Sequence, residues 1–281
     1  MANSDKLFNR LDELLDRLET MMPAQKPTQH DWSYHAYRWR DGALQGIANY
    51  HAVNADDLLF IDRQADLLRN NTRQFMLGHP ANNVLLWGAR GTGKSSIIKA
   101  QLSLFRDEGL CMVEVTKQEA ENLFDIIATL SLNERKYIIY MDDLSFESDD
   151  ESYKALKATL EGSIQAQPSN VLIYATSNRR HLMPESMKDN LDSQMEDGQL
   201  HPSDSIEEKI SLSDRFGLWL SFHPFSQEQY LGVVEQELNK LELTLDDNNR
   251  TEALRFATAR GSRNGRIAHQ FAIFWLGNTL E

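Results

Sequence analysis

The sequence has little of what disulfide-bonded, membrane-spanning or strongly basic proteins require. Its 281 residues include a single cysteine, Cys111, which excludes a disulfide within the chain. Acidic residues outnumber basic ones, 42 to 29, and a net charge of −13 argues against a broad basic surface for nucleic acid. The apolar runs are much too short to span a bilayer, and residues 1–22 lack the apolar block of a signal peptide. We therefore expect a cytoplasmic protein with no membrane partner.

What the sequence does contain is an alternation of short apolar runs with helical patterns. At 41% hydrophobic residues, the chain can bury a sizeable core and support two or three domains. Such alternation is typical of a parallel sheet with right-handed crossovers. It predicts an α/β domain with a five-stranded parallel sheet, whose strands lie near residues 84–87, 112–115, 137–141, 171–175 and 218–222.

A phosphate-binding motif connects the first of these strands to a helix. Residues 88–95 read Gly-Ala-Arg-Gly-Thr-Gly-Lys-Ser, which fits the P-loop pattern G-x-x-x-x-G-K-[ST]. The glycines let the backbone turn tightly, so that N–H groups converge on a phosphate at a helix N-terminus. Lys94 brings a charge to the β- and γ-phosphates, and the Ser95 hydroxyl completes the shell of a Mg²⁺ ion. Rather than a glycine-rich turn that binds nothing, we predict an ATP site formed by Gly88, Arg90, Gly91, Thr92, Gly93, Lys94, Ser95 and Ser96.

Polar side chains follow the third and fourth predicted strands. Asp142 and Asp143 end the third strand, and Asn178 ends the fourth. The carboxyl ends of strands in an open parallel sheet form its ligand-binding edge. There Asp142 is placed to hold Mg²⁺ together with Ser95. Asp143 is placed to orient or deprotonate the attacking water, and Asn178 to hold a water or a γ-phosphate oxygen; the alternative for the two aspartates is a helix cap.

Helical patterns lie on both sides of this core. Leucines between residues 7 and 18 recur at helical spacing and predict an amphipathic helix, which covers the core or docks a partner or sister subunit. Residues 32–40, rich in aromatic and basic side chains, either pack against a domain edge or stack on bases. Residues 185–208 are polar and mostly acidic, which predicts a surface insertion. We expect an N-terminal helical extension and linker over 1–57, a nucleotide-binding core over 58–224 and a small helical domain over 225–281.

Together these motifs resemble the AAA+ ATPases, from about residue 32 to the C-terminus. Asn178 matches the sensor-1 asparagine of that family. Leu59, Ile61 and Gln64 lie where the family contacts adenine. The sequence is similar above all to an uncharacterised bacterial group of AAA+ domains, in the stretches 142–147 and 174–184. The resemblance implies a P-loop core followed by a helical lid.

The same resemblance assigns roles to arginines. Arg215, in Leu-Ser-Asp-Arg-Phe-Gly, matches the arginine finger, a position similar to that of bacterial replication initiators. Arg263, in Gly-Ser-Arg, matches the sensor-2 arginine, with Arg266 as the alternate. Arg215 and Arg263 could instead be surface charges or ion-pair partners within the chain. The sequence departs from the family at Asp143, where many AAA+ enzymes carry Glu. The shorter side chain puts the rate of hydrolysis in question, but not the binding of ATP.

The resemblance implies an ATPase that hydrolyses Mg-ATP and remodels an unidentified protein partner. It also implies a homo-oligomer such as a hexameric ring, because the arginine finger acts on a neighbour's nucleotide. One rival is a nucleotide-gated scaffold with little hydrolysis. Another is a DNA-linked initiator or loader, which the acidic net charge of −13 disfavours.

Overall fold

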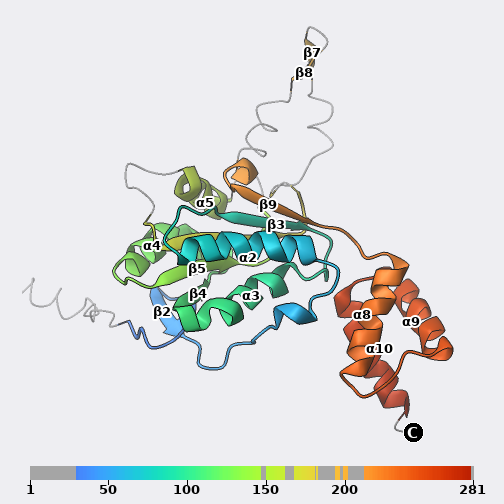
Figure 1. Ribbon diagram of the computed structural model, residues 1–281. Helices are drawn as coiled ribbons and strands as arrows, with labels where there is room; N and C mark the ends of the chain where they lie inside the picture. The colour runs from blue at the N-terminus through green and yellow to red at the C-terminus, as the bar shows by residue number, and fades with distance from the viewer. Residues whose placement is uncertain are drawn as a thin grey trace, which may run out of the picture.

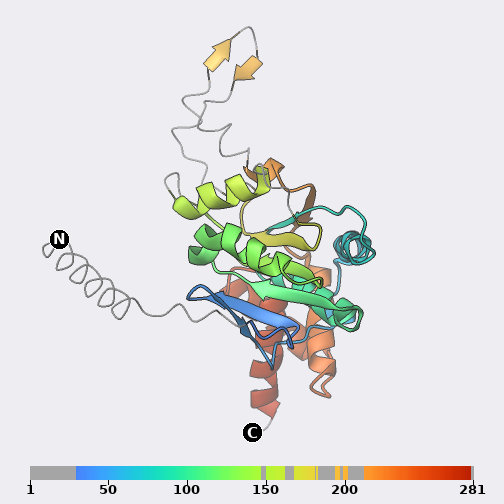
Figure 2. The ribbon, with the colours of Figure 1, turned by 90° about the vertical axis from the view of Figure 1, so that its left-hand side faces the viewer.

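The computed structural model describes most of the chain after residue 29. The described residues are 30–146, 150–161, 168–180, 182, 194–196, 199–201 and 212–279. The predicted leucine-rich helix and most of the predicted acidic insertion therefore lie outside the described residues. Within the insertion, β7 (Gln194–Glu196) pairs antiparallel with β8 (Gln199–His201). The two strands stand away from the rest of the fold in both views (Figures 1 and 2).

A seven-stranded sheet forms the centre of the molecule. All five predicted parallel strands are present, each within a few residues of its expected position, and the sheet order is β2-β1-β4-β5-β6-β3-β9. The predicted count of five strands is two short, because β1 joins β4 in parallel and β2 joins β1 antiparallel. The strands are β1 (Ala36–Arg40), β2 (Ala43–Gly46), β3 (Val84–Gly88), β4 (Leu110–Glu114), β5 (Lys136–Met141), β6 (Val171–Ser177) and β9 (Leu218–Phe222).

The two additional strands come from the aromatic and basic segment. Tyr37 and Trp39 of β1 are 1% and 4% exposed, so they pack into the core and cannot stack on bases. Arg38 points the other way and forms an ion pair with Glu114 of β4. This alternation of buried and exposed residues is the period of a half-covered strand. The packing interpretation of this segment is confirmed for Tyr37 and Trp39.

Helices cover both faces of the sheet. On one face, α2 (Asp62–Met76) and α3 (Lys94–Phe105) pack over one apolar core, and on the other α4 (Leu123–Ser131) and α5 (Glu151–Glu161) pack over a second. Figure 2 shows α4 and α5 on the side of the sheet opposite α2. Three short 3₁₀ helices complete this domain: η1 (Ala55–Asp57), η2 (Arg106–Glu108) and η3 (Gln118–Asn122).

A separate helical unit follows the sheet, beside it in Figure 1. It consists of α8 (Gln227–Asn239), α9 (Asp247–Ala259) and α10 (Gly265–Thr279), and it has a small core of its own. The predicted cap of α8 is present as a capping box between Ser226 and Gln229. The architecture confirms the predicted fold class, a P-loop α/β core followed by a small helical domain, here called the lid, while the exact domain boundaries stay predictions. Among the described residues no helix has the length and hydrophobicity needed to cross a membrane.

Candidate functional site

The P-loop folds as a tight turn between β3 and α3. Gly88 and Gly93 adopt φ angles of 129° and 99°, a region that side chains with a Cβ avoid. Gly93 is the N-cap of α3, so the backbone N–H groups that begin this helix face the loop. Gly88 has a second reason to be glycine, because a Cβ there would lie 1.9 Å from the carbonyl oxygen of Phe222 on β9. The loop therefore has the shape that brings N–H groups to an anion.

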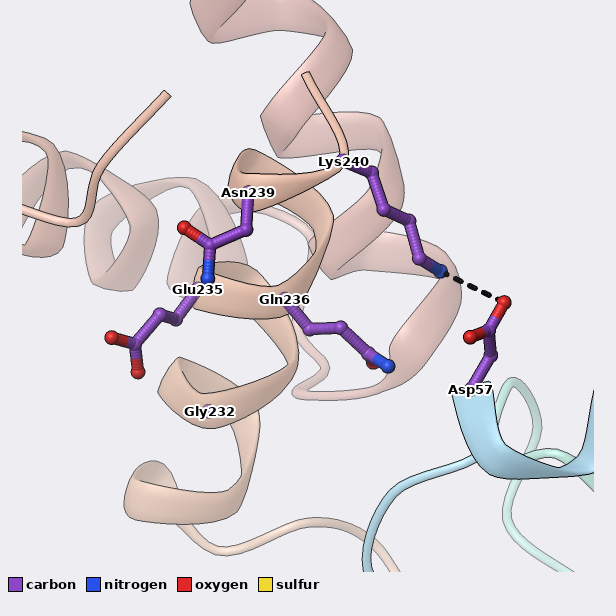
Figure 3. Close-up of a pocket in the computed structure, with 6 residues that line it drawn as sticks. All are labelled: Asp57, Gly232, Glu235, Gln236, Asn239 and Lys240. Atoms are coloured by element: carbon purple, nitrogen blue, oxygen red, sulfur yellow. Dashed lines mark ion pairs between the residues drawn. The ribbon is translucent and has the colours of Figure 1, made fainter. Parts of the chain in front are cut away.

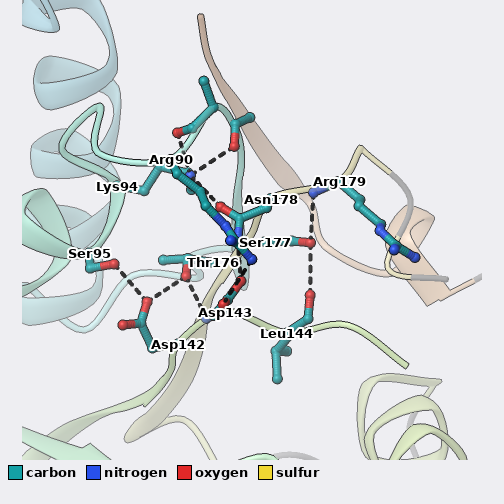
Figure 4. A network of polar contacts seen from close by, with 12 residues as sticks. Arg90, Lys94, Ser95, Asp142, Asp143, Leu144, Thr176, Ser177, Asn178 and Arg179 are labelled. Atoms are coloured by element: carbon teal, nitrogen blue, oxygen red, sulfur yellow. Dashed lines mark hydrogen bonds and ion pairs between the residues drawn. The ribbon is translucent and has the colours of Figure 1, made fainter. Parts of the chain in front are cut away.

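Lys94 lies at the centre of this loop and is 6% exposed. Its Nζ donates to the carbonyl oxygens of Gly88 and Ala89, at 2.8 and 2.7 Å, and to Oδ1 of Asn178 at 3.2 Å (Figure 4). Burial lowers the pKa of Lys94, and the charges of Asp143 and Asp142 oppose that shift. A cationic group is thus held where the P-loop, β5 and β6 meet.

Asp142 is tied to both neighbouring elements through one oxygen. Its Oδ1 accepts hydrogen bonds from Ser95 Oγ on α3, at 2.7 Å, and from Thr176 Oγ1 on β6, at 2.6 Å. Burial acts to raise the pKa of Asp142, but the hydrogen bonds from Ser95 and Thr176 outweigh it and hold that pKa below its ordinary value. The carboxylate is therefore ionised beside the Ser95 hydroxyl, and such oxygen donors suit Mg²⁺.

Asp143 is held from three sides. Its φ of 52° is in the left-handed region, where Asp is tolerated better than most residues, and its N–H donates to Thr176 Oγ1 at 2.9 Å. Its carboxylate accepts a hydrogen bond from Asn178 Nδ2, and Arg90 Nη2 lies 3.9 Å from Oδ2. The predicted residues Lys94, Asp143 and Asn178 therefore lie together. Strain of this kind in the backbone is typical of functional sites.

Thr176 is the site residue that sequence reasoning missed. It is 1% exposed, and its hydroxyl contacts the side chain of Asp142 and the backbone of Asp143. The available signal was a pair of hydroxyl residues, Thr176 and Ser177, at the end of a largely apolar strand and just before Asn178.

A cavity of about 940 Å³ opens beside these residues. One end is polar and holds the P-loop and the two aspartates, and the rest is bounded by residues 51–61 and the lid. Leu59 and Ile61 line it, as the adenine prediction requires. Gln64 is not among the lining residues, because its Nε2 is bonded to the Ser221 carbonyl of β9 at 2.8 Å. The predicted contact of Gln64 with a base is therefore not supported by its position.

The lid reaches the P-loop directly. The N–H of Gly265 at the start of α10 donates to the carbonyl oxygen of Gly91 at 2.9 Å. This contact places Arg266 in the cavity wall, whereas Arg263, which lies before the start of α10, is not among the residues that line it. Arg266 also lies close enough to Lys94 to lower its pKa, so it is better placed than Arg263 to reach the phosphate end.

A second contact links the lid to η1. Lys240 Nζ lies 3.6 Å from Asp57 Oδ2 (Figure 3). The two side chains are 43% and 48% exposed, so this ion pair is worth at most about 1 kcal/mol. It borders a shallow pocket on α8, which is lined by Asp57, Gly232, Glu235, Gln236, Asn239 and Lys240. An interaction so weak allows the lid to move relative to the core.

Arg215 lies apart from the site of its own chain. It is not among the residues that line the cavity, and its Nη2 is 3.2 Å from Glu161 Oε1 at the end of α5. The ion-pair interpretation therefore describes Arg215 within one chain, and any contact with nucleotide would have to be made on another subunit.

Comparison with known proteins identifies the family of this chain. Residues 32–279 match the family described as "Protein of unknown function (DUF815)". The chain belongs to this family. No curated protein is significantly similar to it in sequence.

Two solved structures show how distant the structural likenesses are. The RuvB Holliday junction branch migration motor of Thermotoga maritima is 15% identical, with a TM-score of 0.48 over 78% of this chain and 61% of that one. The Aeropyrum pernix ORC1 protein in complex with DNA is 15% identical, with a TM-score of 0.49 over 75% of this chain and 57% of that one. This member of the DUF815 family thus spans less than two thirds of either structure. Such distant likenesses assign no function.

Replacing Thr176 tests whether its hydroxyl holds the two aspartates. We expect Thr176→Val to lower the free energy of unfolding by about 2 kcal/mol at pH 7, because two polar partners lose a buried hydrogen bond. The folded pKa of Asp142 is depressed, so its stabilising effect is present above the unfolded pKa of about 4 and is lost as the pH falls through the folded pKa. Denaturant unfolding should therefore show a smaller deficit near pH 3 than at pH 7.

Thr72→Val is the matched control for this measurement. Thr72 is equally buried, but its hydroxyl contacts the neutral groups Leu68 O and Tyr174 Oη. Its deficit should be the same at both pH values. A deficit for Thr176→Val that is equally independent of pH would contradict the assigned role.

Proposed function

We propose that this protein is an ATPase that binds Mg-ATP in the cavity, hydrolyses it and uses the turnover to remodel a partner protein. The observation that carries the proposal is the convergence of Lys94, Asp142 and Asn178 from α3 and from the ends of β5 and β6. A cation for phosphate, a carboxylate for a metal and an amide for water or phosphate are the groups that phosphoryl transfer needs. The predicted cytoplasmic location remains a prediction.

The donor set at Asp142 fits Mg²⁺. Ser95 and Asp142 supply a hydroxyl and an ionised carboxylate that are already in contact. Across the part of the chain that the structure describes, no three His, Cys, Asp or Glu side chains gather as a metal cluster. This fits a cation that two protein groups and the phosphates of a nucleotide hold together. Bound there, Mg²⁺ would neutralise the charge that develops on the phosphate oxygens.

The side chains divide the remaining work. When ATP binds, the Lys94 ammonium group exchanges its hydrogen bonds to the loop carbonyls for contacts with the β- and γ-phosphates. The buried positive charge then faces a full negative charge, which offsets the free energy lost on its desolvation. Asp143 accepts a proton from the attacking water, and Asn178 orients that water or a γ-phosphate oxygen. Leu59 and Ile61 give the base an apolar surface. Arg266, on the lid, links the phosphate end of the cavity to movement of α10.

One observation favours a second function, a nucleotide-gated scaffold. Both Asn178 and Arg90 contact the Asp143 carboxylate. These contacts engage the oxygens that would otherwise accept a hydrogen bond from the attacking water. A chain in which these contacts persist after nucleotide binding would bind ATP and turn it over slowly. The DNA-linked function gains nothing from the structure, because Tyr37 and Trp39 are buried.

We also propose a homo-oligomer, with a ring as its form, in which Arg215 acts on a neighbour's nucleotide. The side chain of Arg215 is 47% exposed, so its ion pair with Glu161 is open to solvent and can be replaced by another anionic partner. A guanidinium fork can bind two oxygens of the γ-phosphoryl group at once. Supplied in this way, such a group contributes about 10³–10⁵ in rate in related systems.

Loss of the P-loop lysine should strongly weaken nucleotide binding. We expect Lys94→Ala to weaken ATP affinity about a hundredfold, because a charged contact with the phosphates is lost. Equilibrium titration with a fluorescent ATP analogue measures this. Lys136→Ala is the control, since Lys136 begins β5 at the opposite end from Asp142 and donates to Ser169 O. Unchanged affinity in a folded Lys94→Ala protein would contradict the P-loop assignment.

Mixing two inactive variants tests the action of Arg215 between subunits. We expect Arg215→Ala to bind ATP but lose phosphate release, and a mixture with Lys94→Ala to recover part of it. A complete site then forms wherever an Arg215→Ala subunit supplies the P-loop and a neighbouring Lys94→Ala subunit supplies the arginine. The control is Glu161→Gln, which breaks the ion pair and leaves Arg215 in place, so activity should persist. Equal losses in Arg215→Ala and Glu161→Gln would make the arginine a structural residue.

A further inference from the structure

A buried hydroxyl beside the acidic site lacks a well-aligned hydrogen bond. Tyr140 of β5 is 2% exposed, and its oxygen makes no well-aligned hydrogen bond with another described residue, although the side chains of Asp142 and Ser95 lie close enough to influence its pKa. Leaving a buried hydroxyl poorly bonded costs free energy, and native structures contain few such groups. A better-aligned bond to one of these neighbours in another state of the protein would remove that cost.

The position of Tyr140 shows which partner that is. It precedes Asp142 by two residues, and side chains two apart on a strand leave the same face of the sheet. That face is covered by α3, since Tyr140 packs in one core with Ile97 and Ile98, and Lys99 Nζ lies 5.6 Å from the centre of its ring. Ser95, at the start of the same helix, holds Asp142. The hydroxyl thus lies in the layer between β5 and α3 that also contains the metal-binding groups.

The second carboxylate oxygen of Asp142, Oδ2, can accept a hydrogen bond. The two hydrogen bonds that Asp142 receives from described residues, those of Ser95 and Thr176, both fall on Oδ1. A tyrosine hydroxyl keeps its proton at neutral pH and can only donate toward a carboxylate.

We propose that Tyr140 is a positioning residue of the Mg²⁺ site, whose hydroxyl donates to the Asp142 carboxylate, or to water that it holds, when the cation is bound. The inference rests on the proposed function, because it requires Mg²⁺ at Ser95 and Asp142. Groups that hydrogen-bond to a metal ligand orient it, and their loss typically weakens metal affinity 10- to 100-fold. Mg²⁺ also keeps several of its waters, which provides further acceptors near a buried donor.

The same strand supplies a matched control. Tyr137 is fully buried, and its hydroxyl also makes no well-aligned hydrogen bond with another described residue. It lies near the amino end of β5 and in the core on the opposite face, with Cys111 and Leu130. Tyr137→Phe therefore removes the same atom from the same strand at a place without metal-binding groups.

The test compares Tyr140→Phe, Tyr137→Phe and the parent in full-length protein. A fluorescent ADP analogue is titrated with EDTA present, and its Mg²⁺-dependent gain in affinity is then followed as Mg²⁺ is added. We expect Tyr140→Phe to raise the Mg²⁺ concentration at half-saturation about tenfold while leaving the metal-free affinity of the analogue unchanged. Tyr137→Phe should match the parent. In metal-free, nucleotide-free protein, Tyr140→Phe should not lower the unfolding temperature, because its hydroxyl makes no well-aligned hydrogen bond there.

Each other outcome has a definite meaning. A half-saturation within twofold of the parent overturns the role of Tyr140. So does a Tyr140→Phe protein that is less stable or unfolded without metal, since the hydroxyl then supports the fold. If the parent itself binds no analogue with or without Mg²⁺, the proposed function fails. If the parent binds the analogue and responds to Mg²⁺ while Tyr140→Phe responds equally, only the further inference fails.

Discussion

The hydroxyl of Thr176 is the contact on which the arrangement of the site depends. It donates to the Asp142 side chain and accepts from the Asp143 backbone, so that a single buried atom joins β6 to the end of β5. Asp142 in turn reaches Ser95 on α3. These contacts hold Asp142 against α3, while the carboxylate of Asp143 contacts Asn178. Two neighbouring carboxylates thereby acquire different surroundings, which suits one for a cation and the other for a proton.

The lid contacts this site at the P-loop itself. One backbone hydrogen bond connects Gly265 of α10 to Gly91 in the middle of the P-loop, and Asn264 packs so closely there that a Cβ on Gly91 would lie 2.6 Å from it. A shift of the P-loop on phosphate binding would therefore move the start of α10 or break this hydrogen bond. The weak pair between Lys240 and Asp57 does not oppose such movement. Two distinct arrangements of the lid are what a remodelling cycle would need.

The sequence predicted the order of elements and the phosphate end of the site because both depend on local patterns. The P-loop, the strand that ends at Asp142 and the cap of α8 at Ser226 follow from residue types at fixed spacing. Contacts between distant segments could not be predicted in this way. The pairing of β1 with β4, the bond of Gln64 to Ser221 and the choice of Arg266 over Arg263 depend on how elements pack. Thr176 lies between these cases, since its type was visible but its two partners were not.

In the function that we propose, Asp143 activates water, and ATP binding does not require its carboxylate. The most direct measurement follows ATP binding and Mg²⁺-dependent phosphate release side by side in the parent and in Asp143→Asn. We predict that the parent releases phosphate, and that the variant binds ATP with similar affinity but releases almost none, because Asn cannot accept the proton. Phosphate release at the parental rate by Asp143→Asn, or none by the parent at any protein concentration, would contradict this proposal.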